Sequence, residues 1–138
     1  MRTGRACTPN PVTIGIDDTV VAAAVAMRAH DVGEVVVLDG DVPVGLVTDR
    51  DIALRAVAGH AAELGSLTLR TLLGDTEPVV ATADDPLWKT VKRMRDSGVR
   101  RVVVIDDGRL AGVLTVDDAL GLLAEQLGDV VALFDRRG

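Results

Sequence analysis

The chain has 138 residues, of which 48% are hydrophobic and 26% charged, so it can form one compact domain with a buried core. Its formal net charge of −6 argues against non-specific binding to nucleic acid, which depends on many Lys and Arg contacts to phosphates. Trp88 and Phe134 are its only aromatic residues, so the core is expected to be aliphatic, and a flat ligand would lie between aliphatic side chains.

The sequence shows no sign of a membrane segment or of secretion. The longest uninterrupted apolar run, from Val20 to Met27, is too short to span a bilayer. The N-terminus has no apolar segment of the kind found in secretory signals. The single cysteine, Cys7, cannot form an internal disulfide. We therefore expect a cytoplasmic protein that binds neither membranes nor nucleic acid.

An internal repeat covers most of the chain. With a shift of 67 residues, residues 11–53 align with residues 78–120 without a gap, and 14 of the 43 positions are identical, against about four expected by chance. The matches include Val35-Val36-Val37 with Val102-Val103-Val104, Gly45 with Gly112, Thr48 with Thr115, and Asp51 with Asp118. The sequence therefore contains two copies of one structural unit.

Each copy begins with an extended run, at residues 12–15 and 79–82, and continues with a helix. The acids Asp17-Asp18 and Asp84-Asp85 precede these helices and are expected to cap them, with Asp85 as the N-cap and Pro86 in the first helical position. The residues expected to face inward are Val20, Ala24 and Met27 in the first copy and Leu87, Val91 and Met94 in the second.

Two valine-rich runs joined by a polar turn follow in each copy, which predicts a β-hairpin. The runs are residues 34–38 and 42–47, and residues 101–105 and 109–114. A second helix then begins at Asp49 and at Val116, so each unit reads β-α-β-β-α. The predicted organisation is a first unit at residues 1–58, a linker at 59–77 with a short helix at 67–73, and a second unit at 78–138 with an extended C-terminal helix.

That C-terminal helix carries apolar residues spaced three and four apart: Leu120, Leu123, Leu127, Val130 and Phe134. This spacing is typical of a helix that packs along one side, but it is too short to identify a coiled coil. It fits packing on the protein's own core or on a second subunit. Trp88 lies beside the expected inner face of its helix, where it either flanks the core or lies at a dimer contact, and we favour the dimer contact.

The segment GLVTDRDI, from Gly45 to Ile52, and its counterpart GVLTVDDA, from Gly112 to Ala119, resemble the signature of the cystathionine-β-synthase (CBS) domain family. The tandem β-α-β-β-α unit is also that family's pattern, and the resemblance covers residues 11–127. It implies an α/β (α+β) fold in which tandem repeats dock through their sheets with pseudo-twofold symmetry, usually as a homodimer. It also implies binding of AMP, ADP, ATP or S-adenosylmethionine between the copies, in a sensor of energy or metabolite levels.

The T-x-x-D part of each segment has the chemistry for a sugar phosphate. A Thr at a strand end, followed by a helix N-terminus, offers a hydroxyl and free N–H groups to a phosphate. The Asp three residues later can accept hydrogen bonds from the two hydroxyls of a ribose. The candidate residues are Thr48, Arg50, Asp51, Thr115 and Asp118. The resemblance adds adenine contacts from Thr13, Ile14, Val35 and Val36 in one copy and from Val80, Ala81, Arg101 and Val102 in the other.

A purely structural role explains the same residues. Thr-x-x-Asp at a helix start is also a capping box, in which the two side chains bind each other's backbone N–H groups. Gly45 and Gly112 can simply permit close backbone approach in a sheet. One residue can cap a helix and bind a ligand, so the two roles are compatible.

The two T-x-x-D segments differ in charge. Asp49 and Arg50 follow Thr48, which places a cation close to the expected phosphate, whereas Val116 and Asp117 follow Thr115, which places a second acid beside Asp118. Since like charge disfavours an anion, we expect the Thr48/Asp51 site to take phosphorylated ligands better than the Thr115/Asp118 site. Arg100 and Arg101 would offset this difference if they pointed into the second site; the alternative, which we favour, is that they are solvated charges at a strand edge.

These features favour a non-enzymatic regulatory module that binds an adenine nucleotide and changes its affinity for an unidentified regulated protein. The alternative is a ligand-free dimer that acts as a protein-interaction module, in which the T-x-x-D segments only cap helices. The sequence contains no nucleophile–base pair, metal-ligand spacing or glycine-rich phosphate loop, so we expect neither catalysis nor a bound metal.

Overall fold

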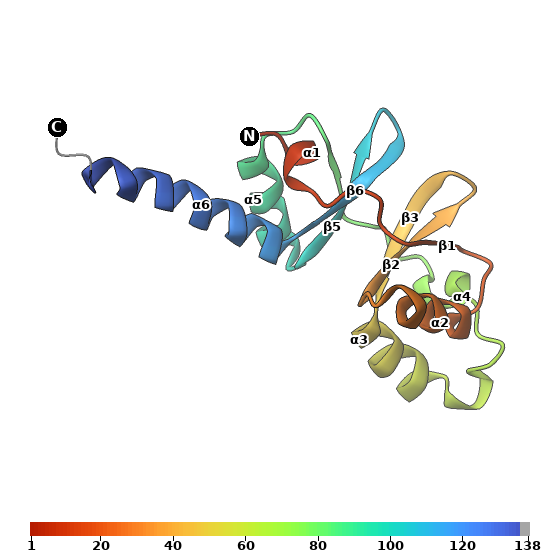
Figure 1. Cartoon of the computed structure of the whole chain (residues 1–138). Coiled ribbons are helices and arrows are strands. Elements are labelled where there is room, and N and C mark those ends of the chain that lie inside the picture. The colour runs from red at the N-terminus through yellow and green to blue at the C-terminus, as the bar shows by residue number, and fades with distance from the viewer. Residues whose placement is uncertain (136–138) are drawn as a thin grey trace.

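The computed structural model describes residues 1–135, which form two similar units side by side (Figure 1). The first unit and the linker contain β1 (Thr13–Gly15), α2 (Val20–His30), β2 (Glu34–Asp39), β3 (Val42–Thr48), α3 (Asp49–Asp51), η1 (Ile52–Val57), η2 (Ala61–Glu63) and α4 (Leu69–Leu73). The second unit contains β4 (Val80–Thr82), α5 (Leu87–Ser97), β5 (Arg101–Asp106), β6 (Arg109–Thr115) and α6 (Val116–Asp135), and a short helix α1 (Thr3–Ala6) precedes both units. This order confirms the predicted β-α-β-β-α repeat.

Each unit has a three-stranded mixed sheet. Strand β2 pairs parallel to β1 and antiparallel to β3, and β5 pairs in the same way with β4 and β6. Both hairpins carry a register shift at equivalent places, after Val37 and after Val104. The predicted hairpins are therefore confirmed.

The two sheets pack face to face. Val36 from the first sheet and Val103 and Val113 from the second are almost fully buried in one cluster. Partly buried residues from both hairpins surround them: Leu38, Leu46, Ile105 and Leu110. The expected docking of the two copies through their sheets is thus confirmed, and burial of these aliphatic side chains holds the halves together.

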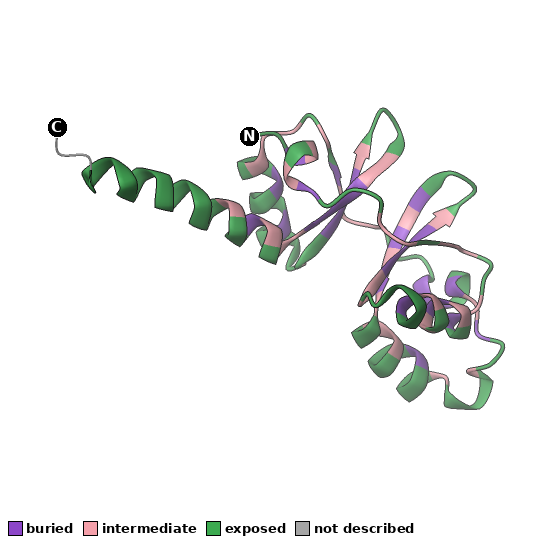
Figure 2. Cartoon of the chain, in the orientation of Figure 1, coloured by how far each residue is buried: buried purple, intermediate pink, exposed green. Residues whose placement is uncertain are grey.

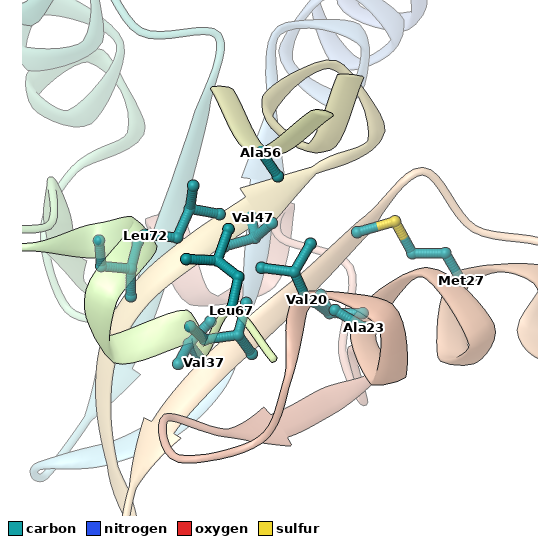
Figure 3. Close-up of a cluster of buried hydrophobic side chains, with 11 residues drawn as sticks. Val20, Ala23, Met27, Val37, Val47, Ala56, Leu67 and Leu72 are labelled. Carbon is teal, nitrogen blue, oxygen red and sulfur yellow. The ribbon is translucent and has the colours of Figure 1, made fainter. Parts of the chain in front are cut away.

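Helices cover the outer face of each sheet and enclose a separate core. In the first unit, Val20, Ala23 and Met27 of α2 pack with Leu67 and Leu72 of the linker against the sheet (Figure 3). The core of the second unit is smaller and contains Cys7, Ala81, Met94, Val102, Val104 and Leu114. The predicted linker helix is therefore part of the first core and is not a solvent-exposed connection.

The inward faces of the two long helices differ slightly from those expected. The buried residues of α2 include Ala23, whereas Ala24 is only half-buried. In α5, Thr90 and Met94 are buried and Val91 is exposed. Thr90 was not expected inside because it is polar, but its hydroxyl lies 2.7 Å from that of Thr3, which gives it a hydrogen-bond partner.

The predicted capping by acids is wrong. Helix α2 is capped by Thr19, whose hydroxyl accepts the N–H of Ala22, and the position before α5 is taken by Pro86 and not by Asp85. Asp18 and Asp85 instead accept N–H groups at the strand ends, from Gly15 and Thr82. These two carboxylates therefore close the turn between strand and helix, and they do not cap the free N–H groups at the start of the helix.

The segment before each unit packs on the other unit. Helix α4 precedes the second sheet but packs into the first core, and α1 precedes the first sheet but contacts β4, β5, β6, α5 and α6. The backbone contacts match: Leu69 N–H donates to Asp18 O, and Thr3 N–H donates to Asp85 O, each at 2.9 Å. Residues 1–8 therefore belong structurally to the second half (Figure 1).

Helix α6 extends well beyond the second unit. Residues 123–135 are all exposed, including Leu127 and Phe134 at 65% and 75% (Figure 2). In residues 1–135, no helix combines the length and the hydropathy that crossing a membrane requires.

Candidate functional site

A cleft of about 480 Å³ lies between the two units, beside the end of β3. The first unit and the linker helix contribute Val44, Gly45, Leu46, Thr48, Arg50, Asp51, Arg55 and Leu73. The segments that lead into β4 and β5 contribute Thr76, Glu77, Pro78, Val79, Gly98, Val99, Arg100 and Arg101, and Val103 completes the lining. A volume of this size and a wall of aliphatic and polar groups are typical of small-molecule sites.

Thr48 and Asp51, which line this cleft, form a complete capping box. The Thr48 hydroxyl accepts the N–H of Asp51 at 3.1 Å, and Asp51 Oδ2 accepts the N–H of Thr48 at 3.0 Å. The structural role considered for these residues is therefore present. It engages one oxygen of the carboxylate, and each carboxylate oxygen has more than one lone pair, so Asp51 retains capacity to accept a ligand hydroxyl.

The cleft carries more positive than negative charge. Arg50, Arg55 and Arg100 line it in addition to Arg101, whereas its acidic lining residues are Asp51 and Glu77. Arg55 donates to the carbonyl of Leu72 at 2.7 Å and so is held against the linker helix. Guanidinium groups bind phosphates with two parallel hydrogen bonds, so this lining favours an anionic ligand.

Arg101 also pairs with Glu34, the residue at its equivalent position in the other copy. Their Nε and Oε2 atoms are 3.3 Å apart, and Oε2 is buried without a hydrogen-bond donor. Burial raises the pKa of Glu34, while the nearby Arg101 charge opposes that rise. The pair joins the starts of β2 and β5 across the pseudo-twofold axis and positions Arg101 at the cleft wall.

The second T-x-x-D segment makes the same cap but meets another part of the chain. Thr115 Oγ1 accepts the N–H of Asp118 at 3.0 Å, and Asp118 Oδ2 accepts the N–H of Thr115 at 3.1 Å. The hydroxyl of Thr8 also donates to the Asp118 carboxylate, at 3.3 Å from Oδ2 and 3.4 Å from Oδ1. Asp118 is therefore in contact with the N-terminal segment of its own chain.

The structure brings only some of the predicted ligand residues together. Thr48, Arg50, Asp51 and Arg101 line the cleft described above. The side chains of Val35, Val36, Ala81 and Val102 are fully buried in the cores, so only their backbone groups are candidates for ligand contacts. Thr13 is exposed, and Ile14 and Val80 are half-buried in the short strands β1 and β4.

The cleft combines the T-x-x-D segment of the first unit with the residues that lead into β4 and β5 of the second unit. The sequence analysis did not predict this combination. Glu77, Pro78 and Val79 precede β4, and Val99 and Arg100 precede β5. The prediction placed such contacts inside the strands, one to three residues later. Arg100 and Arg101, which were considered for Thr115/Asp118 or as solvated strand-edge charges, line the cleft of Thr48/Asp51.

A second hollow, of about 360 Å³, lies between α2 and η1. Its lining is almost entirely aliphatic, from Val20, Val21, Ala24, Val25, Ile52, Val57 and Leu64, with Arg28 as its single charged residue. It lacks the converging polar groups that orient a small ligand. Within residues 1–135, no three His, Cys, Asp or Glu side chains are arranged to hold a metal ion.

Comparison with known proteins identifies the family. The model of the CBS domain matches residues 4–57 and 65–125, which together make up most of the chain. The chain belongs to the CBS-domain family. This family match is to a regulatory type of module, and no catalytic family is indicated.

Several relatives support the assignment. The CBS chain is 34% identical to hypoxic response protein 1 of Mycobacterium tuberculosis over 113 residues, which cover 81% of this chain and 78% of that protein. It is 33% identical to the protein MK0525 of Methanopyrus kandleri over 75% of its own length, but it spans only 53% of that relative.

A solved structure shares the same fold and has a bound ligand. The CBS domain protein PAE2072 of Pyrobaculum aerophilum, complexed with AMP, is 30% identical and superposes with a TM-score of 0.69. The match covers 86% of this chain and 89% of that protein. CBS pairs similar to this chain thus include one that binds an adenine nucleotide.

Proposed function

We propose that this chain is a non-enzymatic regulatory module that binds an adenosine nucleotide in the cleft at Thr48 and Asp51. The observation that supports it best is the composition of the cleft. A capped helix start with an available carboxylate lines the cleft together with the four guanidinium groups of Arg50, Arg55, Arg100 and Arg101, and Val44, Leu46 and Val79 contribute apolar lining. The AMP complex of a protein 30% identical to this chain supports the same ligand class.

Each part of a nucleotide has a partner of suitable chemistry in this cleft. The ribose hydroxyls donate to Asp51, and the phosphate meets the Thr48 hydroxyl and the guanidinium groups of Arg50 and Arg100. The adenine lies between aliphatic side chains, because no aromatic residue lines the cleft. The energy of such a site comes from the charged contacts and from apolar burial together.

A thermal-shift series with AMP, ADP, ATP, NAD and S-adenosylmethionine tests the proposal. A ligand at a hundredfold excess over its Kd stabilises the folded state by about 2.7 kcal/mol. The informative variant is Asp51→Asn, because the amide oxygen still accepts the Thr48 N–H while the carboxylate charge is lost. Hydrogen bonds to a charged group contribute about 1.5–3 kcal/mol, so this variant should bind about 10- to 150-fold more weakly.

The matched control is Asp41→Asn, which removes the same charge from the exposed β2–β3 turn, outside the cleft. It should bind like the parent chain. Equal affinities of the Asp51→Asn variant and the parent would contradict the proposed site. No stabilisation by any ligand of the series would contradict the proposed function.

A ligand-free interaction module is the second candidate. It is favoured by the capping boxes, because Thr48 with Asp51 and Thr115 with Asp118 already satisfy each other's backbone groups. In that case the same ligand series produces no shift, and the exposed helices carry the function. The finding of a specific nucleotide would exclude this alternative.

We also propose that the chain is a homodimer in which the α6 helices pair. Helix α6 has 20 residues, and its apolar stripe (Leu120, Leu123, Leu127, Val130 and Phe134) is exposed throughout. The exposed part of the helix, residues 123–135, has a length at which isolated helices are marginal in water, and Gly121 and Gly128 weaken the helix further. Pairing of two identical stripes, spaced three and four apart, would cover both at once. Trp88, 69% exposed on α5, stays a predicted dimer contact.

The regulated protein and the cytoplasmic location remain predictions. A nucleotide regulates a partner only if it binds more tightly to one of two states of the module. A pull-down with and without the stabilising ligand is the direct measurement of such a difference.

A further inference from the structure

Thr8, just after helix α1, pairs with the edge of the second sheet at β6. The N–H of Thr8 donates to Val113 O at 2.9 Å, and the N–H of Val113 donates to Thr8 O at 3.0 Å, as in one step of an antiparallel pair. The approach is very close: a Cβ on Gly112 would lie 2.3 Å from the Thr8 carbonyl oxygen. Only glycine at position 112 accommodates the backbone of this segment.

The hydroxyl of Thr8 lies at the acid of the second T-x-x-D segment. It donates to the Asp118 carboxylate, with 3.3 Å to Oδ2 and 3.4 Å to Oδ1. In the first unit, the equivalent acid Asp51 lines the open cleft instead. A hydroxyl donating to this carboxylate is the same interaction as the one expected from a ribose.

We propose that residues 2–8, referred to below as the N-terminal segment, occupy the second nucleotide site, with the Thr8 hydroxyl in the position of a ribose hydroxyl. Each chain then binds one nucleotide, at Thr48 and Asp51. The stoichiometry rests on the proposed function, whereas the seating of the N-terminal segment does not.

The N-terminal segment is anchored as part of the fold. Thr3 is completely buried, and its hydroxyl donates to Asp85 O at 2.9 Å and contacts the Thr90 hydroxyl at 2.7 Å. The N–H of Gly4 donates to Ala83 O at 2.9 Å, and Cys7 is 8% exposed within the second core. Because these contacts hold the residues that lead up to Thr8 against the second unit, the occupation of the second site is a resting property of the molecule.

The equivalent segment of the first unit does not close its site. There the residue that approaches the sheet is Leu73, whose side-chain Cδ1 would lie 2.9 Å from a Cβ on Gly45. Gly74 follows with φ +56° and turns the chain, and in residues 1–135 no isolated bridge joins the linker to β3. The linker therefore leaves Thr48 and Asp51 beside open space.

This explanation of the asymmetry differs from the one based on charge. The extra acid Asp117 would lower the affinity of the second site for a nucleotide without abolishing binding, and salt would screen this effect. A site filled by Thr8 is blocked at any salt concentration. The two explanations therefore predict different stoichiometries in a concentrated nucleotide solution.

Calorimetry or equilibrium dialysis with the nucleotide that stabilises the protein decides between them. We expect one nucleotide per chain, loss of binding in Asp51→Asn, and unchanged affinity in Asp118→Asn, which retains the capping oxygen. Two nucleotides per chain, or loss of half the sites in Asp118→Asn, would overturn the inference.

The labelling rate of Cys7 tests the seating of the N-terminal segment without any ligand. Its thiol is buried within the N-terminal segment, so a thiol reagent should label the folded chain at least about a hundredfold more slowly than a peptide of residues 1–10. Equal rates would show that the segment is not seated and would refute the inference. If no nucleotide binds at all, the proposed function fails, and this rate alone still decides whether the segment fills the site.

Thr8→Pro opens the site, because proline lacks the N–H that donates to Val113 and also lacks the hydroxyl. Labelling of Cys7 should become at least about tenfold faster, and the stoichiometry should rise from one to two. Unchanged labelling, or faster labelling with the stoichiometry still at one, would refute the proposed role of Thr8. If the variant does not fold, the wild-type stoichiometry and the wild-type labelling rate still decide.

Discussion

Replacing Thr3 by valine measures how firmly the N-terminal segment is built into the second half. Valine has nearly the shape of threonine, so the change removes hydrogen bonds without creating a cavity. The Thr3 hydroxyl donates its proton to Asp85 O, which means that the proton in the 2.7 Å contact between hydroxyls comes from Thr90. Thr3→Val therefore removes two hydrogen bonds and leaves a buried donor on Thr90 without an acceptor.

The expected cost follows from the burial of both residues, which are 0% and 2% exposed. Two neutral hydrogen bonds contribute about 1 kcal/mol each, and an orphaned buried donor costs about 1–3 kcal/mol. Burial of the added methyl group offsets about 1 kcal/mol. Thr3→Val should thus lower the free energy of unfolding by about 2–4 kcal/mol, and Thr90→Val, which removes one bond and orphans no donor, by about 1 kcal/mol or less.

Urea denaturation gives these free energies of unfolding if their dependence on urea concentration has the same slope in all variants. Thr82→Val, on an exposed strand position, is the control. The double variant should cost less than the sum of the single ones, because it removes the orphaned donor along with its acceptor. A Thr3→Val cost equal to that of the control, or strictly additive single variants, would refute the assignment of the buried pair and the anchoring that depends on it.

Three further outcomes are expected. Glu34→Gln should stabilise the protein in thermal melts at about pH 7.5 and have little effect at about pH 4. Burial raises the Glu34 pKa, so the free-energy penalty of burying its charge appears only as the pH rises through that pKa. Leu127→Glu should give the mass of one chain in light scattering, while Gln126→Glu, which adds the same charge off the apolar stripe, should leave the dimer intact. Thr48→Ala should cost about 1 kcal/mol in chemical denaturation, and Thr48→Ser much less, because serine still caps the helix.

Each of these outcomes has a clear contrary result. A Glu34→Gln variant less stable than the parent at neutral pH would show that the ion pair with Arg101 outweighs the burial of the carboxylate. A parent chain that is already monomeric would refute pairing through α6. Equal stabilities of Thr48→Ala and Thr48→Ser would show that the hydroxyl does not cap α3.

The architecture of the chain could be predicted because local and repeated signals agree. The valine-rich runs at residues 34–38 and 101–105 alternate with polar turns, and the structure places strands at Glu34–Asp39 and Arg101–Asp106. Because the unit is duplicated, every element could be predicted twice. A run that was ambiguous in one copy was assigned from the aligned run in the other copy. Docking of the sheets followed because an aliphatic hairpin needs an apolar surface to cover it.

The details that failed depend on contacts that spacing does not encode. An acid before a helix can accept a helical N–H or the N–H at the end of the preceding strand, and Asp18 and Asp85 do the latter. The inward position of Thr90 required a buried partner, and that partner is Thr3, 87 residues away. No periodicity argument identifies such a pair.

The T-x-x-D residues could be predicted as a candidate site, but the composition of the cleft could not. Thr48 and Asp51 lie in a motif of adjacent residues, whereas Glu77 and Arg100 join them only because the second unit packs across the first. Their signal would have been the charged residues just ahead of each strand. The role of Thr8 had no signal at all, because it lies outside the aligned repeat.

The comparison of Thr8 with Gly74 explains how a duplicated fold acquires two different sites. The hydrogen bonds of Leu69 and Arg70 to the first unit match those of Thr3 and Gly4 to the second, which makes Gly74 and Thr8 structural equivalents. Gly74 has φ +56°, a conformation that glycine adopts without strain, and there the chain turns away from β3. Thr8 instead pairs with β6 and reaches Asp118. Since the carboxylates and their caps are the same in both units, the difference between an open and a filled site arises from the short segments that cross between them.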